Sequence, residues 1–228
     1  MLGEKQLSAV LKSPLFRGLS SEEIGRFLEE IKVYPTPVAK NQILIEQGET
    51  RSSIHLVLDG AAVGERLFED GKRSIINEFP IGSLFGDMLS GGEEKSPVAV
   101  RMLGAGQVLK IPFSALLTQS EGCQKTRETV LRNLFGEISQ KYFALMRRMN
   151  MLLCPSLRGK IALYLLEQAR GEASFSSPHS REEQAQLLSC DRSALSRELS
   201  RLRREKIIDF RGARFTILDE RALYSAAQ

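Results

Sequence analysis

Residues 180–218 read SREEQAQLLSCDRSALSRELSRLRREKIIDFRGARFTIL, and this stretch decides the fold of the C-terminal part of the chain. Ser180 and Glu183 have the spacing of a capping box, which begins a helix. A short turn at Ser189-Cys190-Asp191 leads to a second helix, whose buried stripe consists of leucines at helical spacing: Leu195, Leu199 and Leu202. Two β-prone runs follow, joined by Arg211-Gly212-Ala213-Arg214. Helix, turn, helix and hairpin in this order predict a winged helix-turn-helix.

The second of these helices carries a compact polar patch in its first half. The patch consists of four residues at positions i, i+1, i+4 and i+5: Arg192, Ser193, Ser196 and Arg197. Arginine can bond both guanine acceptors in the major groove, while serine can bond several base edges or a phosphate. Other basic residues are expected nearer the DNA backbone, where they add affinity but little sequence information: Arg181, Arg201, Arg203 and Arg204. A run of charged residues is usually only the solvated face of a helix. Here a hairpin follows the helix, as in a winged helix-turn-helix, so the patch predicts binding to double-stranded DNA.

The sequence pattern of residues from about 32 to 113 is typical of short antiparallel strands. Turn signals such as Asp59-Gly60 and Asp70-Gly71 separate β-prone runs, which are 42–46, 53–58, 61–68, 74–79, 98–103 and 107–111. Runs of this length and spacing indicate an antiparallel barrel or roll, and residues 5–31 before them read as short helices. The predicted fold class is α+β, with an N-terminal antiparallel β-roll of jelly-roll type, a long dimerisation helix and the C-terminal winged helix-turn-helix.

Between the roll and the DNA-binding part, the hydrophobic period becomes helical. Apolar residues alternate at separations of 4 and 3 positions: Leu131, Phe135, Ile138, Tyr142, Leu145, Met149 and Leu152. We call these residues the seam. A heptad period sustained this long favours a partner helix, most simply that of a second copy, over the alternative of packing on the chain's own core. Pro155 ends the seam, so the predicted domains are a sensory roll at 1–120, a dimerisation helix at 121–154 and a DNA-binding domain at 155–228.

Composition excludes several classes of protein. Of the 228 residues, 42% are apolar and 26% are charged, as in globular domains, and the net charge of +4 is weak evidence for an anionic partner. No apolar stretch approaches the roughly 18 residues of a membrane span, and the N-terminus lacks the layout of a signal peptide. Cys123, Cys154 and Cys190 are widely spaced, so we expect isolated thiols in a cytoplasmic protein and leave their redox role open.

A β-roll can also house a metal-dependent enzyme of the cupin type, which needs two or three histidines with a carboxylate. The sequence has only His55 and His179, in different predicted domains, and it has no nucleotide-binding or hydrolase motif at a meaningful spacing. We therefore expect neither an enzyme nor a metal site. A cyclic-nucleotide module that regulates a partner protein is a further alternative, but it would not need a winged helix.

The order of these parts resembles the CRP/FNR family of transcription regulators. The resemblance runs from about residue 13 to 220 and rests on six segments: Ser13–Ser20, Gln47–Glu49, Leu58–Gly60, Gly82–Asp87, Gly159–Ala162 and Ser180–Leu202. It implies a bacterial homodimer that binds palindromic promoter DNA, with RNA polymerase as a further partner and no membrane association. The family's base-reading positions fall on the polar patch, where Ser193 replaces a glutamate and Arg197 keeps the guanine-reading place. Ser189 stands where the family usually has glycine.

The resemblance also implies an effector pocket in the roll, made of Gly86, Asp87, Ser96, Pro97, Leu145 and Met146. Members that bind cyclic nucleotides have a Gly-Glu pair and an arginine followed by a small residue, where this chain has Gly86-Asp87 and Ser96-Pro97. A phosphate buried without a cation is costly, so we expect a small-molecule effector other than cyclic AMP, smaller or more apolar. The alternatives are a cyclic-nucleotide-responsive regulator and a constitutive DNA binder with a vestigial pocket.

No cofactor is expected in the roll. The N-terminal cysteine cluster of the Fe–S members of the family is absent, since the first cysteine is Cys123. A haem would need an axial ligand, and His55 is the only histidine in the predicted roll, where we expect it to be an ordinary strand residue.

Overall fold

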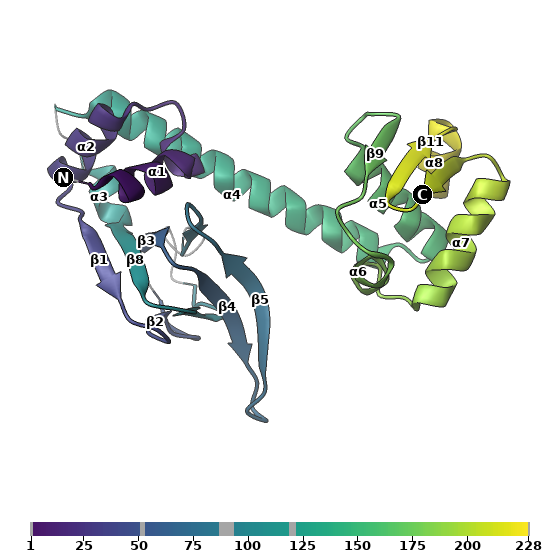
Figure 1. Ribbon diagram of the computed structural model, residues 1–228, viewed down its shortest axis with the longest axis horizontal. Coiled ribbons are helices and arrows are strands. Elements are labelled where there is room, and N and C mark those ends of the chain that lie inside the picture. Colours follow the sequence, from purple (N-terminus) through teal and green to yellow (C-terminus); the bar gives the residue numbers. More distant parts are fainter. Residues whose placement is uncertain (1, 51–52, 87–93, 119–121, 228) are drawn as a thin grey trace. The chain divides into compact units, whose positions relative to one another are not determined.

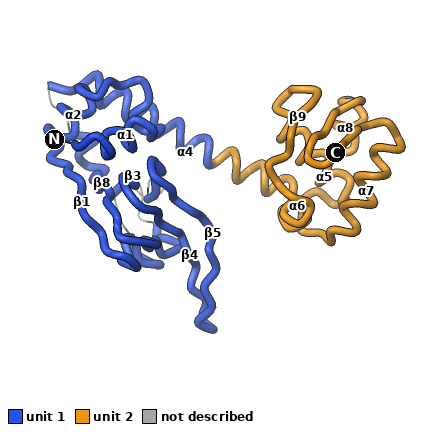
Figure 2. The backbone as a smooth tube through the Cα atoms, viewed as in Figure 1, with its two compact units in different colours: residues 1–141 blue, residues 142–228 orange. Residues whose placement is uncertain are grey.

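The β-prone region folds into two antiparallel sheets that pack face to face in the computed structural model of the chain (Figure 1). The structure describes residues 2–50, 53–86, 94–118 and 122–227. The chain divides into two compact units, residues 1–141 and 142–228 (Figure 2), each with its own hydrophobic core. The long helix α4, Gln124–Leu153, contributes residues to both units.

The roll of the first unit has the predicted antiparallel architecture. The first sheet has the order β1-β8-β3-β6, with β1 Pro35–Val38, β3 Ser53–Asp59, β6 Leu84–Phe85 and β8 Gly106–Pro112. The second has the order β2-β7-β4-β5, with β2 Ile43–Ile45, β4 Ala62–Leu67, β5 Arg73–Phe79 and β7 Ala99–Met102. The strand pairings in both sheets are antiparallel. The prediction of an α+β chain with an N-terminal antiparallel roll is therefore confirmed.

Both faces of strand β3 are buried, so the strand contributes side chains to two cores of the first unit. Successive side chains of a strand point to opposite faces of the sheet. Ile54 and Leu56 belong to the core beneath the helices, whereas Val57 packs in the core between the two sheets. His55 is buried on this strand as well, with its ring stacked on that of Phe85 at 4.9 Å between centroids.

Helices cover the outer face of the first sheet (Figure 1). They are α1 Glu4–Lys12, a 3-10 turn at Pro14–Phe16, α2 Ser21–Glu30, α3 Phe113–Leu117 and the first half of α4. A capping box begins α2, since Ser20 and Glu23 each accept the other's backbone N–H. Val130 and Leu134 of α4 are buried in the same core as Phe27. This half of α4 is thereby fixed to its own unit.

Glu65 of β4 is a buried carboxylate on the second sheet. Arg101 of β7 donates to both of its carboxylate oxygens at 3.0 Å, and Arg73 of β5 donates to one of them at 3.1 Å. The hydrogen bonds from Arg101 are the main reason that the pKa of Glu65 lies below its ordinary value. A carboxyl group with a lowered pKa stabilises the folded state above its unfolded pKa, and this contribution is lost as the pH falls through the folded pKa.

Replacing Glu65 with glutamine should destabilise the roll by about 3 kcal/mol at neutral pH, because Arg101 is left partly buried without its anion. The difference in unfolding free energy between the two proteins should shrink as the pH falls below about 4, where the carboxylate of the wild-type protein becomes protonated and neutral. Urea denaturation at several pH values measures both effects. Glu22→Gln, which removes the exposed ion pair with Arg26, is the matched control and should cost less than about 1 kcal/mol. A deficit that does not change with pH would contradict this account of Glu65.

The second unit is built from short helices and a small sheet (Figure 1). Its elements after α4 are α5 Leu157–Ala169, β9 Ser174–Ser176, α6 Arg181–Leu187, α7 Arg192–Arg204, β10 Ile208–Arg211, β11 Arg214–Ile217 and α8 Glu220–Ala226. Ser156 caps α5 by accepting from the backbone N–H of Gly159 at 2.9 Å. The helix pair α6–α7 followed by the β10–β11 hairpin confirms the predicted winged helix-turn-helix. We call this hairpin the wing.

The structure adds elements that the sequence patterns did not indicate. Strands β1 and β6 were not predicted, and neither was α8. The segment 171–179 shows no strand pattern in the sequence and would be expected to form a loop, but it contains β9, which pairs with β11 and makes the wing a three-stranded sheet of order β10-β11-β9. A run of three residues has almost no periodicity of its own. It becomes a strand because Phe175 stacks on Phe215 across the pair, at 5.6 Å between ring centroids.

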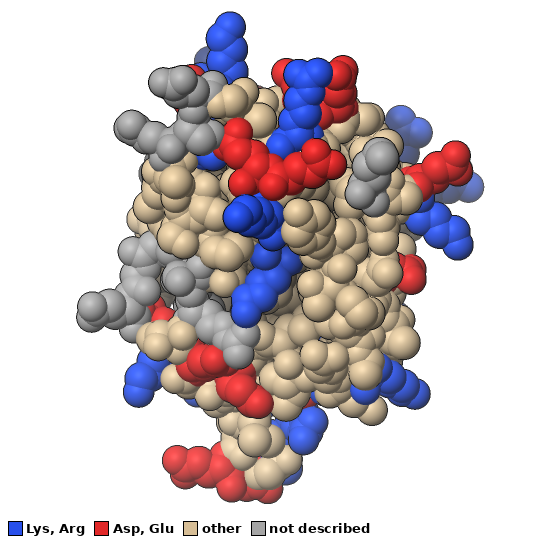
Figure 3. All heavy atoms as spheres, turned by 90° about the vertical axis from the view of Figure 1, so that its left-hand side faces the viewer, with Lys and Arg blue, Asp and Glu red and all other residues tan. Residues whose placement is uncertain are grey.

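Charge on the surface is mixed on the face shown in Figure 3. Lys and Arg side chains lie there among Asp and Glu side chains, with uncharged surface between them.

In the part of the chain that the structure describes, no helix is both long enough and apolar enough to cross a membrane.

Candidate functional site

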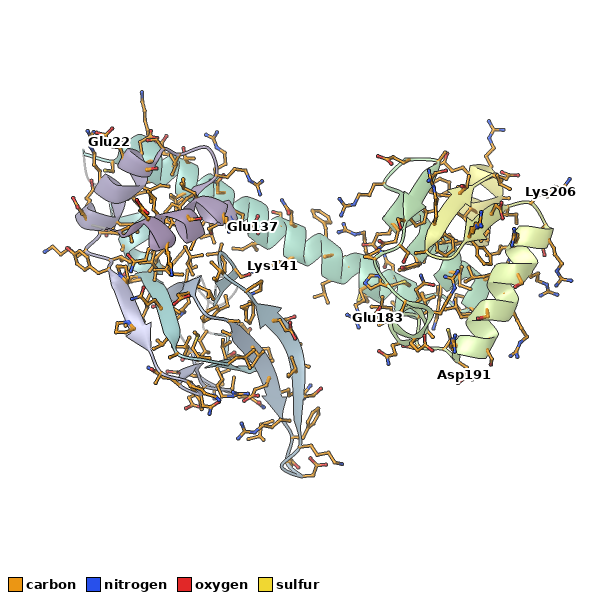
Figure 4. The ribbon with its side chains drawn as sticks, viewed as in Figure 1. Glu22, Glu137, Lys141, Glu183, Asp191 and Lys206 are labelled. Carbon is orange, nitrogen blue, oxygen red and sulfur yellow. The ribbon has the colours of Figure 1, made fainter. Side chains whose placement is uncertain are left out.

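Helix α7 presents one apolar side and one polar side. Leu195, Leu199 and Leu202 are at most 1% exposed and belong to the core of the second unit. On the other side, Ser193, Ser196 and Arg197 are exposed to solvent. Figure 4 labels Asp191 and Lys206, which lie at the two ends of this helix. The polar patch inferred from periodicity is therefore accessible in its full length.

The turn between α6 and α7 has the geometry that the sequence predicts. Ser180 and Glu183 form the expected capping box at the start of α6, with distances of 3.3 and 2.7 Å. Ser189 has φ of 51°, which is the left-handed region where glycine is usual. The serine adopts this conformation while Leu188 beside it is fully buried in the core. The serine that stands in place of the family's glycine therefore adopts a left-handed conformation.

The arginines of the candidate site differ in their partners. Arg192 forms an ion pair with Glu182 of α6, with 3.1 Å between nitrogen and oxygen. Arg197 and Arg204 form no ion pair within the described residues and are exposed. The guanidinium of Arg197 is thus not engaged by a carboxylate of the described residues, whereas that of Arg192 is held by Glu182.

At the C-terminal end of α7 the charged groups are connected to neighbouring elements. Arg203 contacts Asp209 of β10 at 2.6 Å, and its guanidinium lies 5.4 Å from the ring centre of Phe210. Arg158 of α5 forms ion pairs with Glu205 and, at 3.9 Å, with Glu198. Arg201 lies 3.8 Å from Glu198 and 3.9 Å from Glu205. These ion pairs cannot be predicted from the sequence, because local spacing does not show which segments meet.

Arg181, like Arg203, is turned toward the wing. Its guanidinium lies over the rings of Phe210 and Phe215, at 5.1 and 4.9 Å from their centres. It also donates to Gln184 at 2.5 Å and to the carbonyl of Gly212 at 3.4 Å. Burial lowers the pKa of this side chain. A phosphate contact from Arg181 stays a prediction.

The seam residues fall into two groups in the structure. Leu131 and Ile138 pack partly against the core of the first unit. The other seam residues are exposed, with Phe135 68% and Leu145 62% exposed to solvent: Phe135, Tyr142, Leu145, Met149 and Leu152. Phe143, which the heptad pattern did not include, is exposed as well and contacts the Tyr142 ring edge-on. Helix α4 thus presents a row of large apolar side chains that its own chain does not cover.

The residues predicted to form the effector pocket have distinct environments. Gly86 has φ of 76°, and a Cβ at this position would lie 2.6 Å from the carbonyl oxygen of Ser53. Ser96 is 4% exposed, and its hydroxyl donates to the carbonyl of Val98 at 2.6 Å. Pro97 is exposed. Ser96 and Pro97 belong to the first unit, while Leu145 and Met146 belong to the second. Asp87 lies outside the described residues.

The cysteines are free thiols and are partly exposed. Burial raises the pKa of Cys123 and of Cys190, so their thiolate fraction at neutral pH is reduced. The thiolate is the reactive form of cysteine. Among the described residues, no group of three His, Cys, Asp or Glu side chains could hold a metal ion.

The β-roll, the long helix with its exposed apolar row and the exposed basic helix together define a DNA-binding protein of the winged helix-turn-helix class. Comparison with known proteins gives the same result. Residues 159–226 match the Crp-like helix-turn-helix domain, and residues 35–121 match the cyclic nucleotide-binding domain. The chain belongs to the CRP/FNR family of transcription regulators, whose members are generally not enzymes.

Relatives of known identity are similar to this chain over different lengths. The transcriptional activator protein FnrA of Stutzerimonas stutzeri is 28% identical over 209 residues, which are 88% of this chain and 83% of that protein. The anaerobic regulatory protein of Haemophilus influenzae is 27% identical over 135 residues, which are 58% of this chain and 51% of that protein. The crystal structure of the catabolite activator protein of Thermus thermophilus has a TM-score of 0.55 and 21% identity, and the match covers 94% of this chain and 98% of that one. This structural likeness shows a shared fold.

Proposed function

We propose that the protein binds palindromic promoter DNA as a homodimer and is controlled by a small-molecule effector other than cyclic AMP. The observation that carries this proposal is the orientation of α7. Its leucines are buried, so Ser193, Ser196 and Arg197 must face outward, at the place where the fold presents a recognition helix. Arginine and serine are residues that hydrogen-bond to base edges in the major groove.

Dimerisation is the second part of the proposal. The exposed apolar row on α4 would lose contact with water if it packed against the same row of a second copy. A two-fold dimer would place two recognition helices in successive major grooves, about 34 Å apart, and each would read one half of a palindrome. RNA polymerase would be a further partner, as expected for a promoter-bound regulator.

The third part of the proposal concerns the effector. The family's cyclic-nucleotide members use an arginine where this chain has Ser96, whose hydroxyl is already bonded to the backbone of Val98. Neither Ser96 nor Pro97 can supply the positive charge that a cyclic phosphate needs. A smaller or more apolar ligand suits this composition better. To act as an effector, it must bind one arrangement of the dimer more tightly than the other.

Replacing Arg197 with alanine should weaken DNA binding by about 1–3 kcal/mol per half-site and remove a guanine preference, because the arginine offers two parallel donors to that base. Selection from random oligonucleotides measures the preference directly. Arg204→Ala is the matched control, since Arg204 is exposed on the same helix but lies outside the polar patch. It should weaken all sequences alike and reduce the salt dependence. A guanine preference that survives in Arg197→Ala would assign that base to Arg192.

Replacing Leu145 with aspartate should abolish the dimer, because each interface would bury an unpaired carboxylate. Leu145 is the better test than Ile138, which packs partly against the first unit's own core. Light scattering at micromolar concentration gives the oligomeric state. Asn150→Asp adds the same charge to an exposed position of α4 outside the seam and should leave the dimer intact. A Leu145→Asp protein that remains dimeric would show that the seam is not the interface.

Calorimetric titration of the full chain with cyclic AMP and with cyclic GMP should show no binding in the micromolar range. The physical reason is the missing cation at Ser96, which leaves the cyclic phosphate without compensation. Saturable binding of either nucleotide would establish the alternative of a cyclic-nucleotide-responsive regulator.

A further inference from the structure

Arg181 lies against the wing from α6, as Arg203 does from α7. It is the first residue of α6, yet its guanidinium lies over two aromatic rings of the wing sheet, Phe210 and Phe215. A guanidinium is attracted to the face of an aromatic ring, and the attraction grows when water is excluded. Arg181 is half-buried at this place. Its contacts therefore join the first helix of the helix-turn-helix to the wing.

The hydrogen bonds of Arg181 extend this connection on both sides. One nitrogen donates to the carbonyl of Gly212, in the turn between β10 and β11, and another donates to the side-chain oxygen of Gln184. Gln184 is buried and donates in turn to the hydroxyl of Ser177 at 2.9 Å. That hydroxyl lies 2.7 Å from the hydroxyl of Tyr164 in α5. A continuous chain of polar contacts thus runs from α5 through α6 to the turn of the wing.

The partners of Arg181 are neutral. Within the described residues it forms no ion pair with a carboxylate, and its hydrogen bonds go to an amide and a backbone carbonyl. Beside it lies a hollow of about 330 Å³ between α6 and the wing, lined by residues that include His179, Phe210 and Ala213. Arg181 supplies a hydrogen bond from α6 to the turn of the wing. The backbone of the turn is also bonded to Ser177, whose N–H donates to the carbonyl of Ala213 at 2.9 Å.

We propose that Arg181 is a positioning residue that fixes the wing against α6, so that the wing and the recognition helix meet DNA in one arrangement. This inference rests on the proposed DNA binding and assigns to Arg181 a role other than a direct phosphate contact. The role requires arginine specifically, because the planar guanidinium can stack on rings while its edge donates hydrogen bonds. A lysine ammonium carries the same charge but can do neither in this way.

The test compares Arg181→Lys with Arg181→Ala and with the matched control Arg221→Lys in the full chain. Amide hydrogen exchange without DNA should become roughly tenfold faster or more in β10 and β11 of Arg181→Lys, while exchange in α5 stays unchanged. In DNA titrations, Arg181→Lys should lose about as much affinity as Arg181→Ala, on the order of tenfold. Arg221→Lys should leave both the affinity and the exchange in the wing unchanged, because Arg221 is exposed on α8 and lies outside the predicted DNA contacts.

A phosphate contact predicts the opposite results. Arg181→Lys would then retain its affinity with unchanged wing exchange, and only Arg181→Ala would lower the salt slope, by about 0.9; this outcome would overturn the proposal. The variant Phe210→Leu is a second test, because it removes one of the two aromatic rings under Arg181 and keeps the arginine itself. It should also speed exchange in the wing, and unchanged exchange would count against the proposal. Exchange is measured without DNA, so it remains informative even if the wild-type chain fails to bind any promoter.

Discussion

The burial of three leucines along one side of α7 is the interaction on which the candidate DNA-binding surface depends. Leu195, Leu199 and Leu202 fill the core of the second unit, and their removal from water fixes the rotation of the helix about its axis. Because 3.6 residues make one helical turn, the serines and Arg197 are then held on the opposite side. A polar residue moved to the leucine stripe would be buried, and a leucine moved to the patch would be exposed. The function of the surface thus follows from what the helix buries.

Ion pairs and rings distinguish residues of the same type within this surface. Arg192 is paired with Glu182, Arg203 is paired with Asp209, and Arg181 lies on the rings of Phe210 and Phe215. An arginine already engaged in the folded protein must exchange those contacts for contacts with DNA, so its net contribution to affinity is reduced. Arg197 has no such partner among the described residues. The neighbours of each arginine, and not its charge alone, therefore rank its contribution to recognition.

Helix α4 contributes buried side chains to the cores of both units and leaves an apolar row exposed. Val130 and Leu134 are buried in the core of the first unit, and Met151 is buried in the core of the second. The exposed seam residues such as Tyr142 and Leu145 do not take part in either core. A helix that anchors two folded units and still leaves an apolar row open is suited to transmit a change at the row to both units. This arrangement supports the view that dimerisation and DNA binding are coupled through α4.

The sequence by itself determined the features that depend on local periodicity. These are the helix cap at Ser180, the leucine stripe of α7, the polar patch opposite it and the short strands of the roll between their turn signals. Each is set by residues within a few positions of one another, where the 3.6-residue and two-residue repeats act directly. The tertiary structure alone decided the strand β9, the pairing of Glu65 with Arg101 and the contacts of Arg181 with the wing. These join segments that are distant in the sequence, and no local repeat records which distant side chains the packing of the core brings together.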